Sequence, residues 1–365
     1  PPRSTLSSSS AASDVYKRQD IEVILPDRRE TNILTSQTEY LFDLPYDEGS
    51  RRNLTPQPYG LAVDIGTTTV VIYFIDLVTG RLEKIASLLN PQNAYGADVI
   101  SRITWCQTHK TGLKDLQQAI VGALNGEIRK FSAARKLGPE NIERVVIAGN
   151  TTMLHMLLGE DPVPIALAPF RPRFTESQRR TGAATGLAVN EGAEVVTLPS
   201  VSAFVGADIV SGLAALNIKE KNYLFLDIGT NGEIALVTGD EIFACAAAAG
   251  PAFEGANLTC GMNASAGAIS SFTRPGEYRV IGNRQPSGIC GSGIVDIVAW
   301  LTANGLVDET GYMSGDFVID EASNVRVTQR DIREIQLAKS AIYSGCLLYT
   351  SDAADEEDSV DLGGR

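Results

Sequence analysis

Histidine, cysteine and basic residues are scarce in this sequence, and each shortage excludes a class of function. The two histidines, His109 and His155, are too few and too far apart in the chain to predict a zinc site. The five cysteines form no CxxC pair and no tight cluster, which favours reduced thiols over a disulfide framework. With 31 basic against 44 acidic residues, the formal net charge is −13, which argues against nucleic acid as a partner.

Long apolar runs are missing as well. No stretch reaches the length of a transmembrane helix, and the first residues do not have the pattern of a signal peptide. The hydrophobic fraction of 44% and the charged fraction of 21% are ordinary for a globular protein, and 365 residues are enough for two domains. We therefore expect a cytoplasmic protein of two domains that has no membrane contact.

The two ends of the chain differ from the rest in composition. Residues 1–19 are rich in serine, and residues 346–365 interrupt a helical pattern. Both resemble translated sequencing-adapter read-through, and the alternative is a pair of natural disordered tails. Residues 20–57 are polar, end in a proline-containing stretch and are interpreted as a linker segment. We assign no chemistry to either tail.

Two copies of Asp-Ile-Gly-Thr organise the chain between these ends. In the first, Tyr59–Ile75, an apolar strand delivers Asp64 onto a Gly-Thr-Thr turn, and a second strand follows. In the second, Tyr223–Val237, a strand delivers Asp227 onto a Gly-Thr-Asn-Gly turn. One such hairpin is only a turn, but a glycine tip also lets backbone N–H groups approach a phosphate. Two matching copies predict a duplicated fold that holds phosphates from both sides.

The candidate ligands of a metal-bound phosphate lie in these hairpins. Asp64 and Asp227 are predicted to orient Mg²⁺, largely through water. Gly229 and Gly232 are expected to use positive φ. For Thr68 and Thr69, an ordinary role in a strand is an equal alternative. Glu233 either assists Mg²⁺ or faces solvent. The predicted phosphate ligands are Gly66, Thr67, Thr68, Thr69, Gly229, Thr230, Asn231, Gly232 and Glu233.

Hydrophobic periodicity predicts the elements around the hairpins. Apolar residues at helical spacing predict an amphipathic helix over Leu113–Leu137. A buried strand is predicted at Arg144–Ala148, and a helix capped by Asn150 or Thr151 follows it. His155 is interpreted as a packed core residue. Further predicted elements are a strand at Val195–Leu198, a helix at Ile209–Leu216, a helix that follows Ser287 and a helix that begins at Asp331. The thiols of Cys245, Cys260 and Cys290 are expected to be buried.

The two hairpins, with a Gly-Ala-Asp helix start between them, resemble the actin, sugar kinase and heat-shock chaperone ATPase superfamily. The resemblance implies an α/β fold of two ribonuclease-H-like lobes with mixed sheets and a cleft between them, the second lobe being truncated. It places a phosphate-1 motif at Asp64–Thr69, a connect-1 segment at Pro199–Leu213 and a phosphate-2 motif at Asp227–Glu233. The lobes would be a middle domain, 58–217, and a C-terminal ATPase domain, 218–345.

Several strings resemble a narrower family, the reductive activators of corrinoid proteins. They are LAVDIGTTTV, NPQNAYGADVISRI, FLDIGTNGEIAL, AGPAFEGA, GICGSGIVD and DIREIQLAKSAI. The resemblance implies an ATPase, with ATP and Mg²⁺ as cofactors, that allows cob(II)alamin on a corrinoid protein to be reduced to cob(I)alamin. An electron donor is then a second partner, and a homodimer is compatible with the family.

The same resemblance assigns a role to Asp208 and identifies parts that this sequence lacks. Asp208 would be the general base or water-orienting residue, and an N-cap for the helix at 209–216 is the compatible structural role. The [2Fe–2S] cluster of the family is expected only in a ferredoxin-like domain upstream, because no four-cysteine pattern precedes Asp20. The glycine-rich adenosine motif of the family is expected after Ser344.

Two other functions stay open at this point. A small-molecule kinase of the same superfamily would use Asp208 to deprotonate a substrate hydroxyl group. A non-catalytic docking fragment would use neither hairpin for chemistry.

Overall fold

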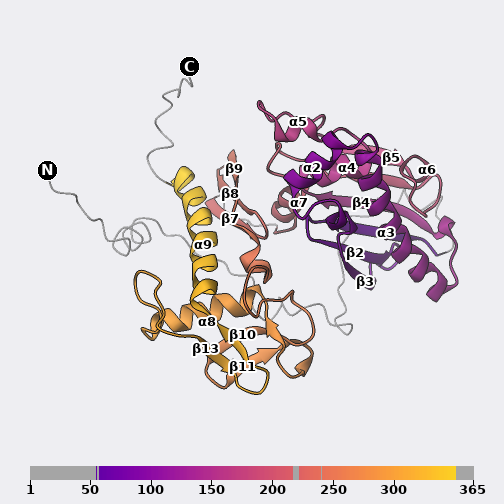
Figure 1. The fold of residues 1–365 in the computed structure, drawn as a ribbon. Helices are drawn as coiled ribbons and strands as arrows, with labels where there is room; N and C mark the ends of the chain where they lie inside the picture. The colour runs from indigo at the N-terminus through magenta and orange to yellow at the C-terminus, as the bar shows by residue number, and fades with distance from the viewer. Residues whose placement is uncertain (1–54, 56, 217–221, 240, 351–365) are drawn as a thin grey trace, which may run out of the picture.

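The computed structural model describes residues 55, 57–216, 222–239 and 241–350, which form two lobes (Figure 1). The predicted tail 1–19, nearly all of the predicted linker and residues 351–365 lie outside the described residues. None of the described helices is long and apolar enough to cross a membrane. The mixed α/β architecture that the superfamily resemblance implies is confirmed.

The first lobe is built on a six-stranded mixed sheet with the order β3-β2-β1-β4-β6-β5. Central strand β1 pairs antiparallel with β2 and parallel with β4, so Asp64 lies opposite Val71 on one side and Ala148 on the other. Buried and less buried residues alternate along β2, as expected for a strand whose two faces differ. The strands are β1 (Tyr59–Ile65), β2 (Thr69–Asp76), β3 (Leu82–Leu89), β4 (Ile142–Gly149), β5 (Gln178–Thr181) and β6 (Glu194–Thr197).

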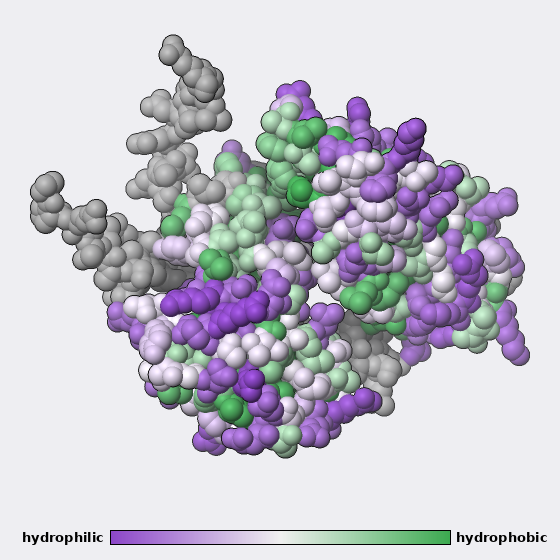
Figure 2. All heavy atoms as spheres, in the orientation of Figure 1, coloured by the Kyte–Doolittle hydropathy of each residue, from purple (hydrophilic) through white to green (hydrophobic). Residues whose placement is uncertain are grey.

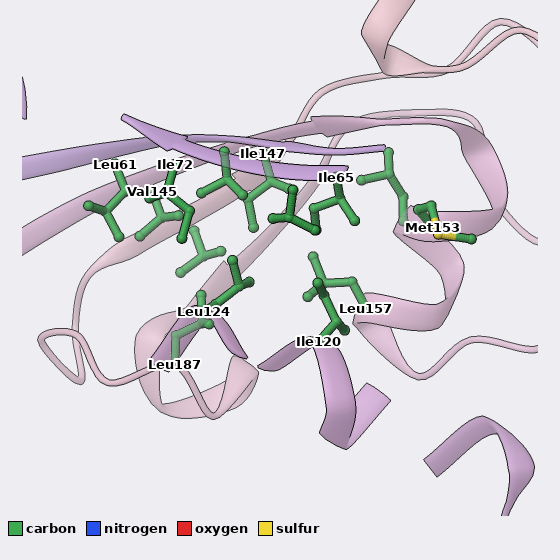
Figure 3. Close-up of a cluster of buried hydrophobic side chains, with 14 of the residues drawn as sticks. Leu61, Ile65, Ile72, Ile120, Leu124, Val145, Ile147, Met153, Leu157 and Leu187 are labelled. Atoms are coloured by element: carbon green, nitrogen blue, oxygen red, sulfur yellow. The ribbon is translucent and has the colours of Figure 1, made fainter. Parts of the chain in front are cut away.

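Helices cover this sheet and form the larger core. The predicted amphipathic helix is confirmed as α3, which directs Ile120 and Leu124 toward Ile147 and other strand residues (Figure 3). Full burial of each such side chain contributes roughly 1.5–3 kcal/mol to folding. The helices are α2 (Val99–Thr108), α3 (Gly112–Arg135), α4 (Thr151–Leu158), α5 (Val163–Ala166), α6 (Gly182–Thr185) and α7 (Ala207–Leu216), with 3-10 helices at Pro91–Ala94 and Pro139–Asn141.

The second lobe repeats the three-stranded meander of the first. Its strands β7, β8 and β9 are antiparallel neighbours, as β1, β2 and β3 are, and helix α9 packs against β8 and β9. Two smaller sheets and α8 form the far end of the lobe (Figure 1). The elements are β7 (Asn222–Ile228), β8 (Gly232–Thr238), β9 (Glu241–Ala247), β10 (Ala268–Arg274), β11 (Glu277–Val280), β12 (Gly288–Ile289), α8 (Gly291–Ala303), β13 (Phe317–Asp320), β14 (Val325–Val327) and α9 (Gln329–Thr350), with 3-10 helices at Pro251–Glu254 and Ile281–Asn283.

Helix α7 links the lobes and lies close to both. A Cβ atom on Gly206, just before the helix, would lie 2.5 Å from the Cα of Asn150. A Cβ atom on Gly212 would lie 2.8 Å from the ring of Phe225 in β7. Small residues at these two positions therefore let the helix approach the first lobe at its start and the second lobe along its length.

Three local predictions need correction. Asp208 lies in the first turn of α7 and not at the N-cap, because the helix already begins at Ala207. Helix α9 begins at Gln329, where the hydroxyl of Thr328 accepts from the N–H of Asp331, and it runs through Thr350 into the segment interpreted as a tail. Of the three cysteines expected to be buried, only Cys290 is fully so, and Cys245 and Cys260 are half-buried.

Other local predictions are confirmed. The side chain of Asn150 caps α4 by accepting from the N–H of Met153. His155 is fully buried and stacks on Phe174, with ring centroids 4.1 Å apart. Its Nε2 accepts from the N–H of Arg173, and burial lowers the pKa of the imidazole, so it is a neutral core residue. All five cysteines are free.

Candidate functional site

The tip of the first hairpin is a loop of Thr67 and Thr68 between β1 and β2. The loop is closed by a hydrogen bond from the N–H of Gly66 to the carbonyl of Thr69, 2.9 Å. Within the described residues, the N–H groups of Thr67 and Thr68 donate to no protein acceptor. Thr69 is the first residue of β2, so its strand role is the one observed. The loop therefore has two unpaired backbone donors, as an anion-binding hairpin requires.

The second hairpin is stabilised by residues of its own lobe. The N–H of Gly229 donates to the carbonyl of Asn231, 2.9 Å, and the hydroxyl of Thr230 donates to the carboxylate of Glu254. Gly232 is already the first residue of β8 and packs closely on Ile342 of α9. Strand β8 thus begins at the last glycine of the predicted Gly-Thr-Asn-Gly turn.

The two tips meet across the lobes. The hydroxyl oxygens of Thr68 and Thr230 lie 3.5 Å apart, and either can be the donor. In the space-filling view the surface is hollowed between the two lobes (Figure 2). The structure therefore brings together the two halves of the predicted phosphate site, which are far apart in the sequence.

The charges of Asp208 and Asp227 act on Asp64 and Glu233, so these four acidic side chains form one electrostatic group. Burial, with the charges of Asp208 and Asp227 nearby, raises the pKa of Asp64 to about 6. Burial raises the pKa of Asp208 to about 6, and the charge of Asp227 adds to the effect. Asp227 itself has a pKa raised by burial. Asp64 and Asp227 are nevertheless exposed side chains, so water screens much of these effects.

Glu233 is the most strongly perturbed member of the group. Its side chain is only 8% exposed, so it does not face solvent, which was one of the two predicted roles. Burial, followed by the charges of Asp208 and Asp227, raises its pKa to about 8. Nearby like charges favour the protonated acids, most strongly at the buried Glu233, and a cation placed among them would favour the ionised ones. No three of the acidic, His or Cys side chains in the described part are close enough to hold a metal directly.

The predicted role of positive φ at the hairpin glycines is wrong. Neither Gly229 nor Gly232 lies in the left-handed region. A Cβ atom on Gly66 would lie 2.8 Å from the carbonyl oxygen of Thr69, and one on Gly232 would lie 2.8 Å from Ile342. At Gly229 the nearest atom would be 3.7 Å away, so this position accepts a methyl group.

The residues that support the hairpins were not identified from the sequence. Asn150 donates its amide N–H to the hydroxyl of Thr67, 3.0 Å, and Glu254 accepts from Thr230. Asn90 and Arg102 donate hydrogen bonds to backbone carbonyls of the first loop. Three of these residues lie in strings quoted above for their family resemblance, but spacing alone gave no sign that their side chains face the loops.

Comparison with known proteins places both lobes in one family. Residues 59–221 match the model of the RACo middle region, and residues 221–361 match that of the C-terminal domain of RACo, the ASKHA domain. A solved structure, the reductive activator for corrinoid, iron-sulfur protein, has a TM-score of 0.74 and 34% identity, covering 80% of this chain and 51% of its own.

Two characterised relatives are similar over most of the chain. The corrinoid activation enzyme RamQ of Eubacterium limosum is 37% identical over 339 residues, which cover 84% of this chain and 57% of RamQ. The [Co(II) methylated amine-specific corrinoid protein] reductase of Methanosarcina barkeri is 26% identical over 322 residues, covering 78% of this chain and 58% of the reductase. The chain thus spans a little over half the length of these relatives.

Proposed function

This chain belongs to the RACo family, and on that premise we propose that it is the ATPase core of a reductive activator of a corrinoid protein. The reaction is the one-electron reduction of cob(II)alamin to cob(I)alamin on the partner, with the electron coming from a separate low-potential donor. Hydrolysis of ATP by water to ADP and phosphate accompanies it. The contact between Thr68 and Thr230 carries this proposal, because it joins the two predicted phosphate hairpins at one site.

The residues present fit a magnesium-bound nucleotide. The unpaired N–H groups of Thr67 and Thr68 offer donors to phosphate oxygens. The carboxylates of Asp64 and Asp227 would hold Mg²⁺, largely through its water ligands. When bound, Mg²⁺ neutralises the charge that develops on the transferring phosphoryl group. A cation would also offset the repulsion among the four acids, which is the physical reason for expecting it there.

Asp208 is the residue proposed to act on water. It is held in the first turn of α7, and its Oδ1 accepts from the N–H of Ile209 at 2.9 Å. That hydrogen bond fixes the carboxylate, which would orient a water molecule and accept its proton. Because burial raises the pKa of Asp208 to about 6, the group is basic enough to take a proton near neutral pH.

Coupling to the partner follows from the position of the site between two lobes. A nucleotide that contacts both hairpins binds best to one relative position of the lobes, and so shifts the population toward it. If the corrinoid protein binds the two positions with different affinity, hydrolysis supplies free energy to the uphill electron transfer. The five free cysteines support a reducing compartment, and a cytoplasmic location is part of the proposal.

The test measures reduction of the corrinoid directly. The formation of cob(I)alamin is followed by absorbance with the corrinoid protein, a low-potential donor and Mg-ATP. Asp227→Asn is expected to abolish the ATP-dependent part of the reduction, and Asp316→Asn, an exposed acid of the second lobe, serves as the control. Undiminished reduction by the Asp227→Asn protein would refute the proposal, and a phosphorylated small molecule in place of free phosphate would indicate a kinase.

A further inference from the structure

We propose that Arg102 is a positioning residue for the first phosphate hairpin. Together with Asn90 it binds the backbone carbonyls of the hairpin tip and so orients the N–H groups of the tip. The inference rests on the proposed function, since it assigns a role within the same site. Arg102 is fully buried, which is rare for an arginine, and it lies on α2, outside both hairpins. Asn90 is 1% exposed and precedes the 3-10 helix at Pro91–Ala94.

All five N–H donors of the Arg102 guanidinium have acceptors. Nε donates to the carbonyl of Gly96 at 2.9 Å, and one terminal nitrogen donates to Gln92 Oε1 at 3.4 Å and to Met153 Sδ at 3.1 Å. The other terminal nitrogen donates to the carbonyl of Thr67 at 2.6 Å and to the side chain of Asn93. An arginine has five such donors in a fixed plane, so this set of acceptors defines one orientation.

Arg102 and Asn90 together bind three consecutive loop carbonyls. The Asn90 amide donates to the carbonyl of Gly66 at 2.8 Å, and its backbone N–H donates to the carbonyl of Thr68 at 2.8 Å. Arg102 binds the carbonyl between them, that of Thr67. In a trans peptide the N–H points opposite to the C=O. Drawing the carbonyls of Gly66 and Thr67 inward therefore turns the next two N–H groups outward, and these are the unpaired donors of the loop.

The charge of Arg102 adds to this geometric role. No carboxylate of the described residues forms a salt bridge with it, and all of its acceptors are uncharged. Burial lowers its pKa to about 10, so the guanidinium is still charged at neutral pH. The charge of Asp98 opposes this lowering without forming a salt bridge, and a phosphate on the other side of the loop would be a further opposite charge within the field of the guanidinium. The second hairpin is supported differently, by the carboxylate of Glu254.

The test measures binding of Mg-ATP and of magnesium tripolyphosphate to the full 365-residue chain by calorimetry. Arg102→Met is expected to weaken both by the same factor, roughly tenfold or more, as for loss of a charged hydrogen bond. Asn90→Ala, which removes the side-chain donor without adding a charge, is expected to act in the same direction. Arg180→Met, an exposed arginine of the same lobe, makes the same change in net charge and should leave both affinities unchanged.

A spectroscopic readout separates positioning from general stability. In ¹⁵N-labelled protein, tripolyphosphate should shift the N–H signals of Thr67 and Thr68, and Arg102→Met should remove these shifts while thermal unfolding stays cooperative. If Arg102→Met does not fold, Asn90→Ala and Arg102→Lys test the proposal in its place. Lysine keeps the charge but has only three donors, so the Arg102→Lys chain should still bind both probes more weakly than the wild type. Wild-type affinity and shifts in folded variants would overturn the role of Arg102 alone, whereas a wild-type chain that binds neither probe would overturn the proposed function.

Discussion

The hydroxyl oxygens of Thr68 and Thr230 lie 3.5 Å apart, although 162 residues separate them in the sequence. Each residue is at the tip of a hairpin that follows an acidic residue at the end of a strand. The two hairpins come from different lobes, so their distance reports the relative position of the lobes. With the tips in contact, no phosphate group fits between these two hydroxyls.

A reversible cross-link between the tips should therefore block the site. We expect a Thr68→Cys/Thr230→Cys chain to bind Mg-ATP when reduced and to bind at least about tenfold more weakly when oxidised, because the disulfide prevents the tips from separating. Calorimetry with and without reductant measures this difference. The two single-cysteine chains, treated with the same oxidant, control for the five native thiols. Equal binding by the oxidised and reduced double variants would show that nucleotide does not need the tips to part.

The two hairpin glycines should respond differently to a methyl group. Gly66→Ala places a Cβ atom 2.8 Å from a backbone oxygen of its own hairpin, and such overpacking costs roughly 1–3 kcal/mol. Gly229→Ala meets nothing closer than 3.7 Å and should change the free energy of unfolding by less than about 0.5 kcal/mol. Denaturant unfolding and Mg-ATP binding of the two variants check the contrast. If Gly229→Ala is the more damaging change, the local geometry of the hairpins is not as described.

Asp208→Asn should separate hydrolysis from binding. Asparagine keeps the shape and can still accept from the N–H of Ile209, but it cannot take a proton from water. We expect the rate of ATP hydrolysis in a single turnover to fall roughly 100-fold to 10,000-fold, as for loss of a general base. The dissociation constant of Mg-ATP should change little, and Asp316→Asn is the matched surface control. Hydrolysis at the wild-type rate would exclude Asp208 as the group that acts on water.

Much of the fold could be predicted because its signals are local. Apolar periodicity identified α3, and the pattern of strand, acid and glycine turn identified both hairpins. The duplicated pattern also predicts that Asp64 and Asp227 belong to one site, since a repeated motif predicts a repeated structure. These inferences need only neighbours in the chain.

What could not be predicted depends on contacts between distant segments. That Arg102 binds the carbonyl of Thr67 follows from how α2 packs against α3 and α5, and no spacing in the sequence encodes it. Positive φ was expected at Gly229 from the turn alone, whereas the observed backbone is set by the strands that flank it. Whether Glu233 faces solvent could not be decided from the sequence, because burial of a strand residue depends on which face of the strand the rest of the lobe covers.

The buried acid Glu233 should make stability depend on pH. Its pKa is raised from an ordinary value of 4.5 to about 8, chiefly by burial. Below pH 4.5 both the folded and the unfolded chain hold the proton, so the group contributes no difference there. Between pH 4.5 and about 8 the folded chain retains a proton that the unfolded chain has lost, so stability falls as the pH rises.

Glu233→Gln removes this titration while keeping the size of the side chain. Without Mg²⁺, we expect the variant to match the wild type near pH 4.5 and to gain stability through this window, levelling off above about pH 8. At about 1.4 kcal/mol for each pKa unit, the full gain is on the order of a few kcal/mol. Urea unfolding at several pH values measures it, with Glu309→Gln, an exposed acid of the same lobe, as the control. A stability difference that stays constant across this range would mean that Glu233 is not held as a protonated acid in the folded chain.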